Sequence, residues 1–192
     1  MRKIIFLIIS LLITSCENMN DNQPAKIVFL GDSITQQAED FEDGFISLIR
    51  QNLVQDKFEL VGKGISGNKV SDLLTRYKSD VIDLNPDIVF IYIGINDVWH
   101  KYDFGTGSDI DLYEKGLRTI ISDIKSLGSE IVLCTPTVIG ENTGDFVLGN
   151  QFKDVETMEK MNGDLDTFSE VVRKLSNEYG TELLDLRKIF MD

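Results

Sequence analysis

The chain is poor in several residue types, and each shortage excludes a class of protein. Its 192 residues include two cysteines, three prolines and one histidine. Two cysteines cannot form a disulfide framework or a metal site built from cysteine ligands. Lysine and arginine total 19 against 32 aspartates and glutamates, which gives a net charge of −13. A chain with this acidic excess is not expected to bind nucleic acid or anionic lipid headgroups through a basic patch.

What the chain does contain is the composition of an ordinary folded domain. Hydrophobic residues make up 42% of it and charged residues 27%, which excludes a collagen-like, low-complexity or broadly disordered chain. A length of 192 residues predicts one domain, or one domain with a short appendage.

The N-terminus has the features of an export signal. Arg2 and Lys3 precede an apolar run over residues 4–13, which is too short to span a bilayer but has the proportions of a secretory signal peptide. The residues Ile-Thr-Ser-Cys that end at Cys16 resemble a bacterial lipobox. That resemblance implies cleavage before Cys16, lipid on its sulfur and anchoring in the cell envelope. The alternative is a plain signal peptide with an incidental cysteine.

These features predict the organisation of the chain. Residues 1–15 are expected to be a signal peptide, residues 16–25 the lipidated N-terminus with a polar tether, and residues 26–192 the folded domain. The second cysteine, Cys134, lies in an apolar run and is expected to be a small buried hydrophobe.

The body of the chain alternates between two apolar patterns. Five short, nearly continuous apolar runs predict strands that are buried on both faces of a parallel sheet; they cover residues 27–30, 58–61, 88–93, 131–134 and 183–186. Between them, apolar stripes at helical spacing predict helices, in residues 45–53, 70–77, 117–127 and 168–179. Gly128 and Gly180 are expected to end the last two helices. The pattern predicts an α/β domain of three layers, α/β/α, around a five-stranded parallel sheet. The longest irregular stretch is expected over residues 138–161.

Small polar residues follow the first three strands. We call residues 31–35 (GDSIT) the first segment, 62–68 (GKGISGN) the second segment and 94–97 (GIND) the third segment. The carboxyl ends of parallel strands meet at one edge of the sheet, where ligands bind in such folds. A serine on a sharp strand-to-helix turn is exposed as a nucleophile, and backbone N–H and asparagine NH₂ groups nearby can stabilise an oxyanion by roughly 3 kcal/mol each. Taken singly, GDS is also a common turn and GIND an ordinary loop.

The second segment also matches a dinucleotide-binding pattern. Its glycines, Gly62, Gly64 and Gly67, fit G-x-G-x-x-G. A dinucleotide site needs an acidic residue at the end of the next strand, where this chain has Gly-Ile-Asn. The spacing therefore does not favour this interpretation.

Together the three segments resemble the SGNH (GDSL-type) hydrolases, in their order and in their placement after strands. The resemblance implies a flavodoxin-like fold and the hydrolysis of carboxylic esters, often on glycans or lipids, through an acyl-enzyme and without a cofactor. It implies that Ser33 is the nucleophile, and that an oxyanion hole is formed by the N–H groups of Ser33 and Gly67 and the side chain of Asn96. Further residues are expected to line the substrate pocket: Asp32, Asn68, Asp97, Trp99 and His100.

The three segments do not contain a general base that could activate Ser33. Family members carry Asp-x-x-His after the fifth strand, whereas His100, beside the third segment, is the one histidine here. Three hypotheses follow. The natural product continues past Asp192 through such a block and a closing helix, which is the hypothesis we favour, since a sheet without that helix would expose an apolar strip. Alternatively, the chain is a non-catalytic binding protein or pseudoenzyme, or His100 or a base from solvent supports weak turnover.

Overall fold

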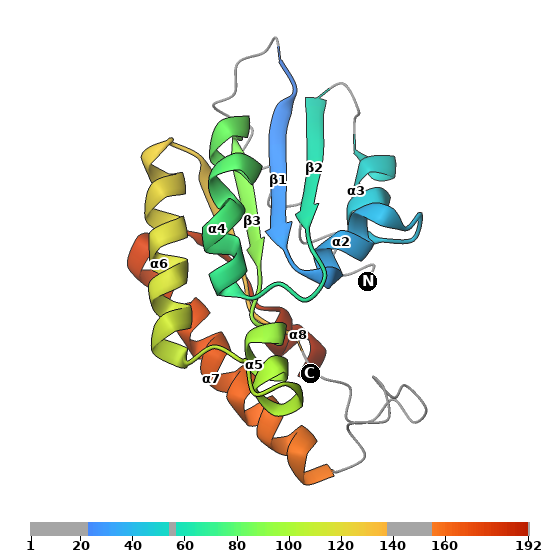
Figure 1. The fold of residues 1–192 in the computed structure, drawn as a ribbon. Helices are drawn as coiled ribbons and strands as arrows, with labels where there is room; N and C mark the ends of the chain where they lie inside the picture. Colours follow the sequence, from blue (N-terminus) through green and yellow to red (C-terminus); the bar gives the residue numbers. More distant parts are fainter. Residues whose placement is uncertain (1–22, 54–56, 138–154, 192) are drawn as a thin grey trace.

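The computed structural model describes residues 23–53, 57–137 and 155–191 (Figure 1). Five parallel strands form one sheet in the order β2-β1-β3-β4-β5. The strands are β1 (Ala25–Gly31), β2 (Phe58–Gly64), β3 (Ile88–Tyr92), β4 (Glu130–Cys134) and β5 (Glu182–Leu184). The predicted five-stranded parallel sheet is confirmed.

Helices cover both faces of the sheet, as the three-layer prediction requires. They are α2 (Ser33–Asp40), α3 (Phe45–Asn52), α4 (Val70–Asp80), the 3₁₀ turn η3 (Ile82–Leu84), α5 (Ile95–Asp103), α6 (Ile110–Ser126), α7 (Val155–Tyr179) and α8 (Leu186–Met191). We call the side packed by α4, α6 and α7 the α4/α6/α7 face, and the opposite side the α2/α3/α8 face (Figure 1). None of the helices within the described ranges is both long and apolar enough to cross a membrane.

The strand sequences explain the two apolar layers. All five residues of β3 are buried, because alternate side chains point to opposite faces and both faces are packed. Val89 and Ile91 face the α4/α6/α7 layer, whereas Phe90 and Tyr92 face the α2/α3/α8 layer. Cys134 is buried and unpaired in the second layer, as predicted.

Two predicted helix ends are confirmed at glycines. Gly128 has a φ of +85° after α6, and Gly180 has a φ of +60° after α7. This left-handed conformation has little cost for glycine, which has no Cβ, and it ends a helix by turning the chain away from it.

The structure departs from the predicted elements in several places. β1 begins at Ala25, one residue before the expected start of the domain, and β5 ends at Leu184, so that Leu186 begins α8. The third segment, expected as a loop, forms the first turn of α5. α7 begins at Val155, so the stretch 155–161 is helical and not irregular. Residues 1–22, with the predicted signal peptide and Cys16, and the predicted loop 138–154 lie outside the described residues.

Both missed helical stretches have a physical reason. Met161 is fully buried and extends the apolar stripe of α7 toward Leu165 and Phe168, at the i, i+4 and i+7 spacing of one helix face. In α5, Gly94 at the N-cap has a φ of +132°, a conformation open to glycine. The side chains of Asn96 and Asp97 do not cap α5 but bond to the carbonyl of Asn68 and the N–H of Val70.

Candidate active site

The register of the sheet brings the three polar segments together. Gly31, at the end of β1, is paired with Gly64 of β2 and with Tyr92 of β3. The first, second and third segments therefore leave the sheet side by side at its carboxyl edge, as expected for parallel strands. The carboxyl end of β1 lies between the carboxyl ends of β2 and β3.

The first segment turns from β1 directly into α2. Asp32 is the N-cap of α2, and its Oδ1 accepts a hydrogen bond of 3.0 Å from the backbone N–H of Ile34. Ser33 is the first residue of the helix and is half-buried. This is the sharp strand-to-helix turn that the sequence predicted for the serine.

Asp32 is 2% exposed, and burial raises the pKa of its carboxyl to about 7. The N–H of Ile34 opposes this rise, the charge of Asp97 adds to it, and the charge of Arg76 opposes it. Burial dominates because a carboxylate loses its hydration in the interior. Near neutral pH this side chain is therefore partly protonated.

The second segment forms a tight turn packed against the first. The N–H of Asn68 donates to the carbonyl of Ile65 over 3.2 Å, and the N–H of Ile65 donates to the carbonyl of Gly31 over 3.3 Å. A Cβ on Gly64 would lie 2.1 Å from the backbone nitrogen of Gln36, so only glycine permits this approach. Gly67 is exposed at the outer end of the turn, with a φ of +76°.

The third segment reaches the second through an amide side chain. Asn96 is 4% exposed, and its Nδ2 donates a hydrogen bond of 3.0 Å to the backbone carbonyl of Asn68. An amide nitrogen carries two hydrogens, so this bond fixes the orientation of Asn96 and uses only one of them. The second hydrogen is available for an acceptor beside the turn.

Asp97 holds the helix that follows the second segment. Its two carboxylate oxygens lie 3.1 and 3.2 Å from the backbone nitrogen of Val70, which starts α4. Burial raises the pKa of Asp97 to about 6, and hydrogen bonds from Ser108 and Val70 oppose that rise. Asp32 and Asp97 are both buried, and their carboxylates accept hydrogen bonds from backbone N–H groups. That these two residues line the substrate pocket stays a prediction.

The remaining two pocket candidates lie on α5. Trp99 is half-buried and packs against the core of the α4/α6/α7 face. His100 lies beside the second segment, since a Cβ on Gly67 would be 3.9 Å from its Cε1 atom. Burial and then the charge of Lys69 lower the pKa of His100, against the opposing charges of two nearby aspartates, so the ring is neutral at pH 7.

Two residues that hold these segments were not identified from the sequence. Gln36 accepts a 2.8 Å hydrogen bond from the N–H of Ser66 through Oε1. Arg76, on α4, bonds to both the first and the second segment. Neither residue has a sequence signal, because polar residues on amphipathic helices normally face solvent.

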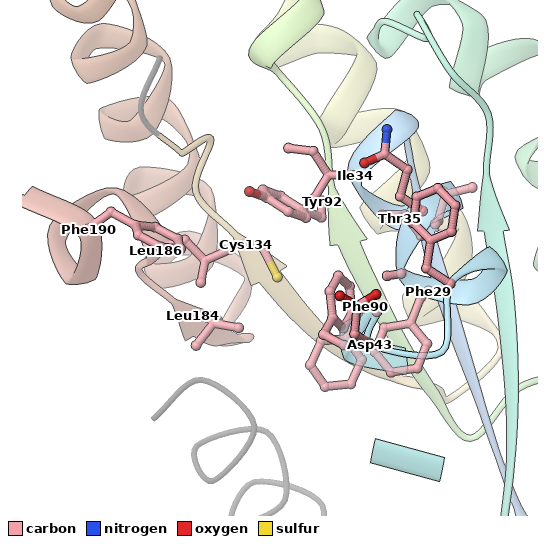
Figure 2. A pocket seen from close by; sticks show the side chains of 16 residues that line it. Phe29, Ile34, Thr35, Asp43, Phe90, Tyr92, Cys134, Leu184, Leu186 and Phe190 are labelled. Carbon is pink, nitrogen blue, oxygen red and sulfur yellow. The ribbon is translucent and has the colours of Figure 1, made fainter. Parts of the chain in front are cut away.

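A separate apolar cavity of about 330 Å³ lies on the α2/α3/α8 face (Figure 2). Phe29, Phe90 and Leu184 contribute from the sheet, and Ile34 and Thr35 bring it close to the turn that holds Ser33. Large apolar side chains are exposed around this face: Phe41, Phe190 and Met191 are 55%, 48% and 60% exposed.

The family of the chain follows from comparison with known proteins. Residues 29–192 match the GDSL-like Lipase/Acylhydrolase family. An acetylxylan esterase from Geobacillus stearothermophilus is 31% identical over 183 residues, which is 86% of this chain and 77% of the relative.

Solved structures agree with that assignment. The crystal structure of the acetyl xylan esterase AlAXEase is 39% identical, with a TM-score of 0.74 over 86% of this chain and 79% of that one. A structure of an acetylxylan esterase from G. stearothermophilus is 30% identical, with a TM-score of 0.69 over 90% and 80% of the two chains. Catalytic mutants of that esterase replace a serine, an aspartate or a histidine by alanine. The chain thus belongs to the GDSL-like lipase/acylhydrolase family, the SGNH hydrolases, and is by family a carboxylic ester hydrolase.

Proposed function

We propose that the protein hydrolyses acyl esters at Ser33, with an oxyanion hole formed by the N–H groups of Ser33 and Gly67 and by Asn96 Nδ2. The observation that supports this most directly is the 3.0 Å hydrogen bond from Asn96 Nδ2 to the Asn68 carbonyl. It joins the third segment to the turn that carries Gly67. An oxyanion hole needs donors that are fixed before the reaction begins, and this bond fixes one of them.

The proposed reaction has two steps. Ser33 Oγ attacks the ester carbonyl carbon while its proton passes to a base, and the carbonyl electrons move to the oxygen held by the three donors. The carbonyl re-forms, the alcohol leaves with a proton, and an acyl-Ser33 ester remains. Water then attacks that ester in the same way, which releases the carboxylic acid and restores the serine hydroxyl.

Two candidate functions, ester hydrolysis and the binding of esters without hydrolysis, differ in whether a base can accept the proton of Ser33. His100 is the one histidine of the sequence, and its neutral ring beside Gly67 is in the form that accepts a proton. A serine without a base is a poor nucleophile. The second candidate function is a binding protein that holds acyl esters without turnover, which is the outcome expected if no base reaches Ser33.

We propose a glycan acetyl ester as the substrate. Two relatives with 31% and 39% identity are acetylxylan esterases, and Gly67 is exposed to solvent at the outer end of its turn. Acetate release from acetylated xylo-oligosaccharides, compared with release of butyrate from an aryl butyrate, tests this preference.

We further propose export and lipid anchoring at Cys16, on the sequence pattern described above. Metabolic labelling with an alkyne-bearing fatty acid in a bacterial host tests this. Label on the wild type that is lost in Cys16→Ala supports anchoring, and equal label on both contradicts it.

Hydrolysis of p-nitrophenyl acetate by the wild type, Ser33→Ala and Ser126→Ala tests the central proposal. Ser126 is an exposed serine at the end of α6, outside the three segments, and serves as the control. We expect Ser33→Ala to reduce the rate to the buffer background and Ser126→Ala to leave it unchanged. Equal rates for the wild type and Ser33→Ala would overturn turnover at Ser33. His100→Gln added to the series decides whether His100 accepts the proton.

A further inference from the structure

Arg76 lies outside the three polar segments and forms hydrogen bonds that join them. It projects from α4 with its side chain only 13% exposed. Its Nη2 donates to the carbonyl of Gly31 over 2.7 Å, its Nη1 to the carbonyl of Lys63 over 3.1 Å, and its Nε to Oδ1 of Asn68 over 2.8 Å. Gly31 opens the first segment, and the other two acceptors belong to the second.

The third segment joins the same network through Asn68. The side-chain oxygen of Asn68 is held by Arg76, and its backbone carbonyl accepts from Asn96 Nδ2. One guanidinium group is therefore bonded directly to two segments and through a single residue to the third. We infer that Arg76 is a positioning residue, which sets the spacing of the Ser33, Gly67 and Asn96 donors. The catalytic part of this inference rests on the proposed function.

Arginine suits this task for a geometric reason. Its planar guanidinium carries five N–H donors in a fixed fork, so it can hold several carbonyl oxygens at set distances from one another. The fork is itself fixed by Asp80, one turn further along α4, whose Oδ2 lies 2.5 Å from Nη1. The first turn of α4 is held to the third segment by Asp97. Arg76 therefore projects from a helix that is attached to the site at its start.

Other hydrogen bonds also connect the segments, and the alternative hypothesis is that these bonds alone set the geometry of the site. The N–H of Ile65 donates to Gly31, and the N–H of Ser66 donates to Gln36. If these bonds set the geometry alone, Arg76 contributes only to stability. A displacement of about 1 Å in a catalytic group can cost roughly 100-fold in rate, so kinetics separates the two roles.

The kinetic test compares Arg76→Met and Arg76→Lys with Arg50→Met. Arg50 is a matched control, because it also bonds a carboxylate, that of Glu39, and a backbone carbonyl, that of Leu60, and neither acceptor belongs to the three segments. For aryl acetate hydrolysis we expect Arg76→Met to lower kcat by about 10- to 100-fold, with KM changed less than about twofold. We expect Arg76→Lys to restore part of the loss and Arg50→Met to leave kcat unchanged.

Hydrogen exchange gives a second measurement that does not require turnover. The amides of Ile65 and Asn68 are hydrogen-bonded in the turn, and their exchange reports how often it opens. We expect exchange at these amides to rise at least about tenfold in Arg76→Met relative to the wild type, and not to change in Arg50→Met.

The outcomes separate this inference from the proposed function. If the wild type does not hydrolyse the ester, turnover at Ser33 is rejected. If amide exchange is then faster in Arg76→Met and unchanged in Arg50→Met, positioning by Arg76 is still supported. Unchanged exchange at both amides, or a kcat for Arg76→Met equal to that of Arg50→Met in an active protein, overturns the inference. Thermal unfolding of each variant confirms that the measurements are made on folded protein.

Discussion

On the α4/α6/α7 face the helices bury the larger of the two apolar clusters, and the hollow among α5, α6 and α7 is lined partly by charged side chains. The α2/α3/α8 face instead holds an apolar cavity of about 330 Å³ with exposed aromatic side chains at its margin. The polar segments lie at the sheet edge between these faces, and both faces anchor them: Arg76 and the Val70 N–H belong to α4, whereas Ser33 and Gln36 belong to α2. The comparison indicates that the site depends on both faces, and that α4 supplies more of its side-chain hydrogen bonds.

The largest expected effect is at the sheet edge itself. Asn96→Ala removes one proposed oxyanion donor and its bond to the Asn68 carbonyl. We expect the Ser33-dependent kcat to fall by about 10² to 10³, with little change in KM, since the interaction strengthens only in the transition state. Steady-state kinetics with an aryl acetate measures this. Asn52→Ala is the control, because the Asn52 amide donates to the Leu48 carbonyl within α3; a loss of less than about threefold in Asn96→Ala would contradict the role of Asn96.

The next largest effect is a difference in stability between alanine substitutions on the two faces. Ile121 on α6 is fully buried, and its change to alanine is expected to lower the free energy of unfolding by about 3 kcal/mol. Leu186 on α8 lines the cavity, so it has fewer neighbours to lose, and Leu186→Ala should cost about 1 kcal/mol. Urea denaturation measures both. Equal losses would show that the two faces are packed alike.

The third effect is a dependence of stability on pH. The pKa of Asp32 in the folded state, about 7, lies above its ordinary value of 3.8, so the folded protein binds more protons than the unfolded chain between these values. The free energy of unfolding therefore falls as pH rises through this window, by about 2 kcal/mol between pH 5 and pH 7.

Asp32→Asn isolates this contribution. Asparagine has no charge to titrate, and its side-chain oxygen can still accept the N–H of Ile34 as a helix cap. We expect the difference in unfolding free energy between wild type and Asp32→Asn to shift in favour of the wild type as pH is lowered from 7 to 5. A difference that is constant with pH would refute the raised pKa.

The smallest effect on stability is expected at the margin of the cavity. Phe190 is 48% exposed and lines the cavity. Phe190→Ser should change the free energy of unfolding by less than about 0.5 kcal/mol but should reduce the fluorescence of a bound anilinonaphthalene sulfonate dye. Leu127→Ser, at an exposed position at the end of α6, is the control and should leave the fluorescence unchanged. Equal fluorescence of Phe190→Ser and the wild type would show that the dye does not bind there.

Much of the fold was predictable because its signals are local. Residues 88–92 are apolar without a break, which favours a strand buried on both faces, and that strand is β3. Gly128 and Gly180 follow apolar stripes and end the helices there. The helix at α5 was missed because Gly-Ile-Asn-Asp also fits a turn, and the contacts of its apolar side chains, Val98 among them, with the α4/α6/α7 core favour the helix.

The placement of the three segments was predictable, whereas the burial of the two carboxylates was not. The order of the three segments placed Ser33, Gly67 and Asn96 at the same sheet edge, since parallel strands end together. Nothing in the sequence showed that Asp32 and Asp97 would be buried on backbone N–H groups. That outcome depends on how closely α2 and α4 pack against the turns.

The sequence by itself determined which chemical groups the protein has and at which edge of the sheet they meet, because apolar periodicity sets the strands and the polar segments follow their ends. The tertiary structure decided which donors are fixed and by what. Arg76 lies 45 residues from Gly31 in the chain, yet its Nη2 is 2.7 Å from the Gly31 carbonyl. Contacts of this kind depend on helix packing and side-chain rotamers, which local sequence patterns do not specify.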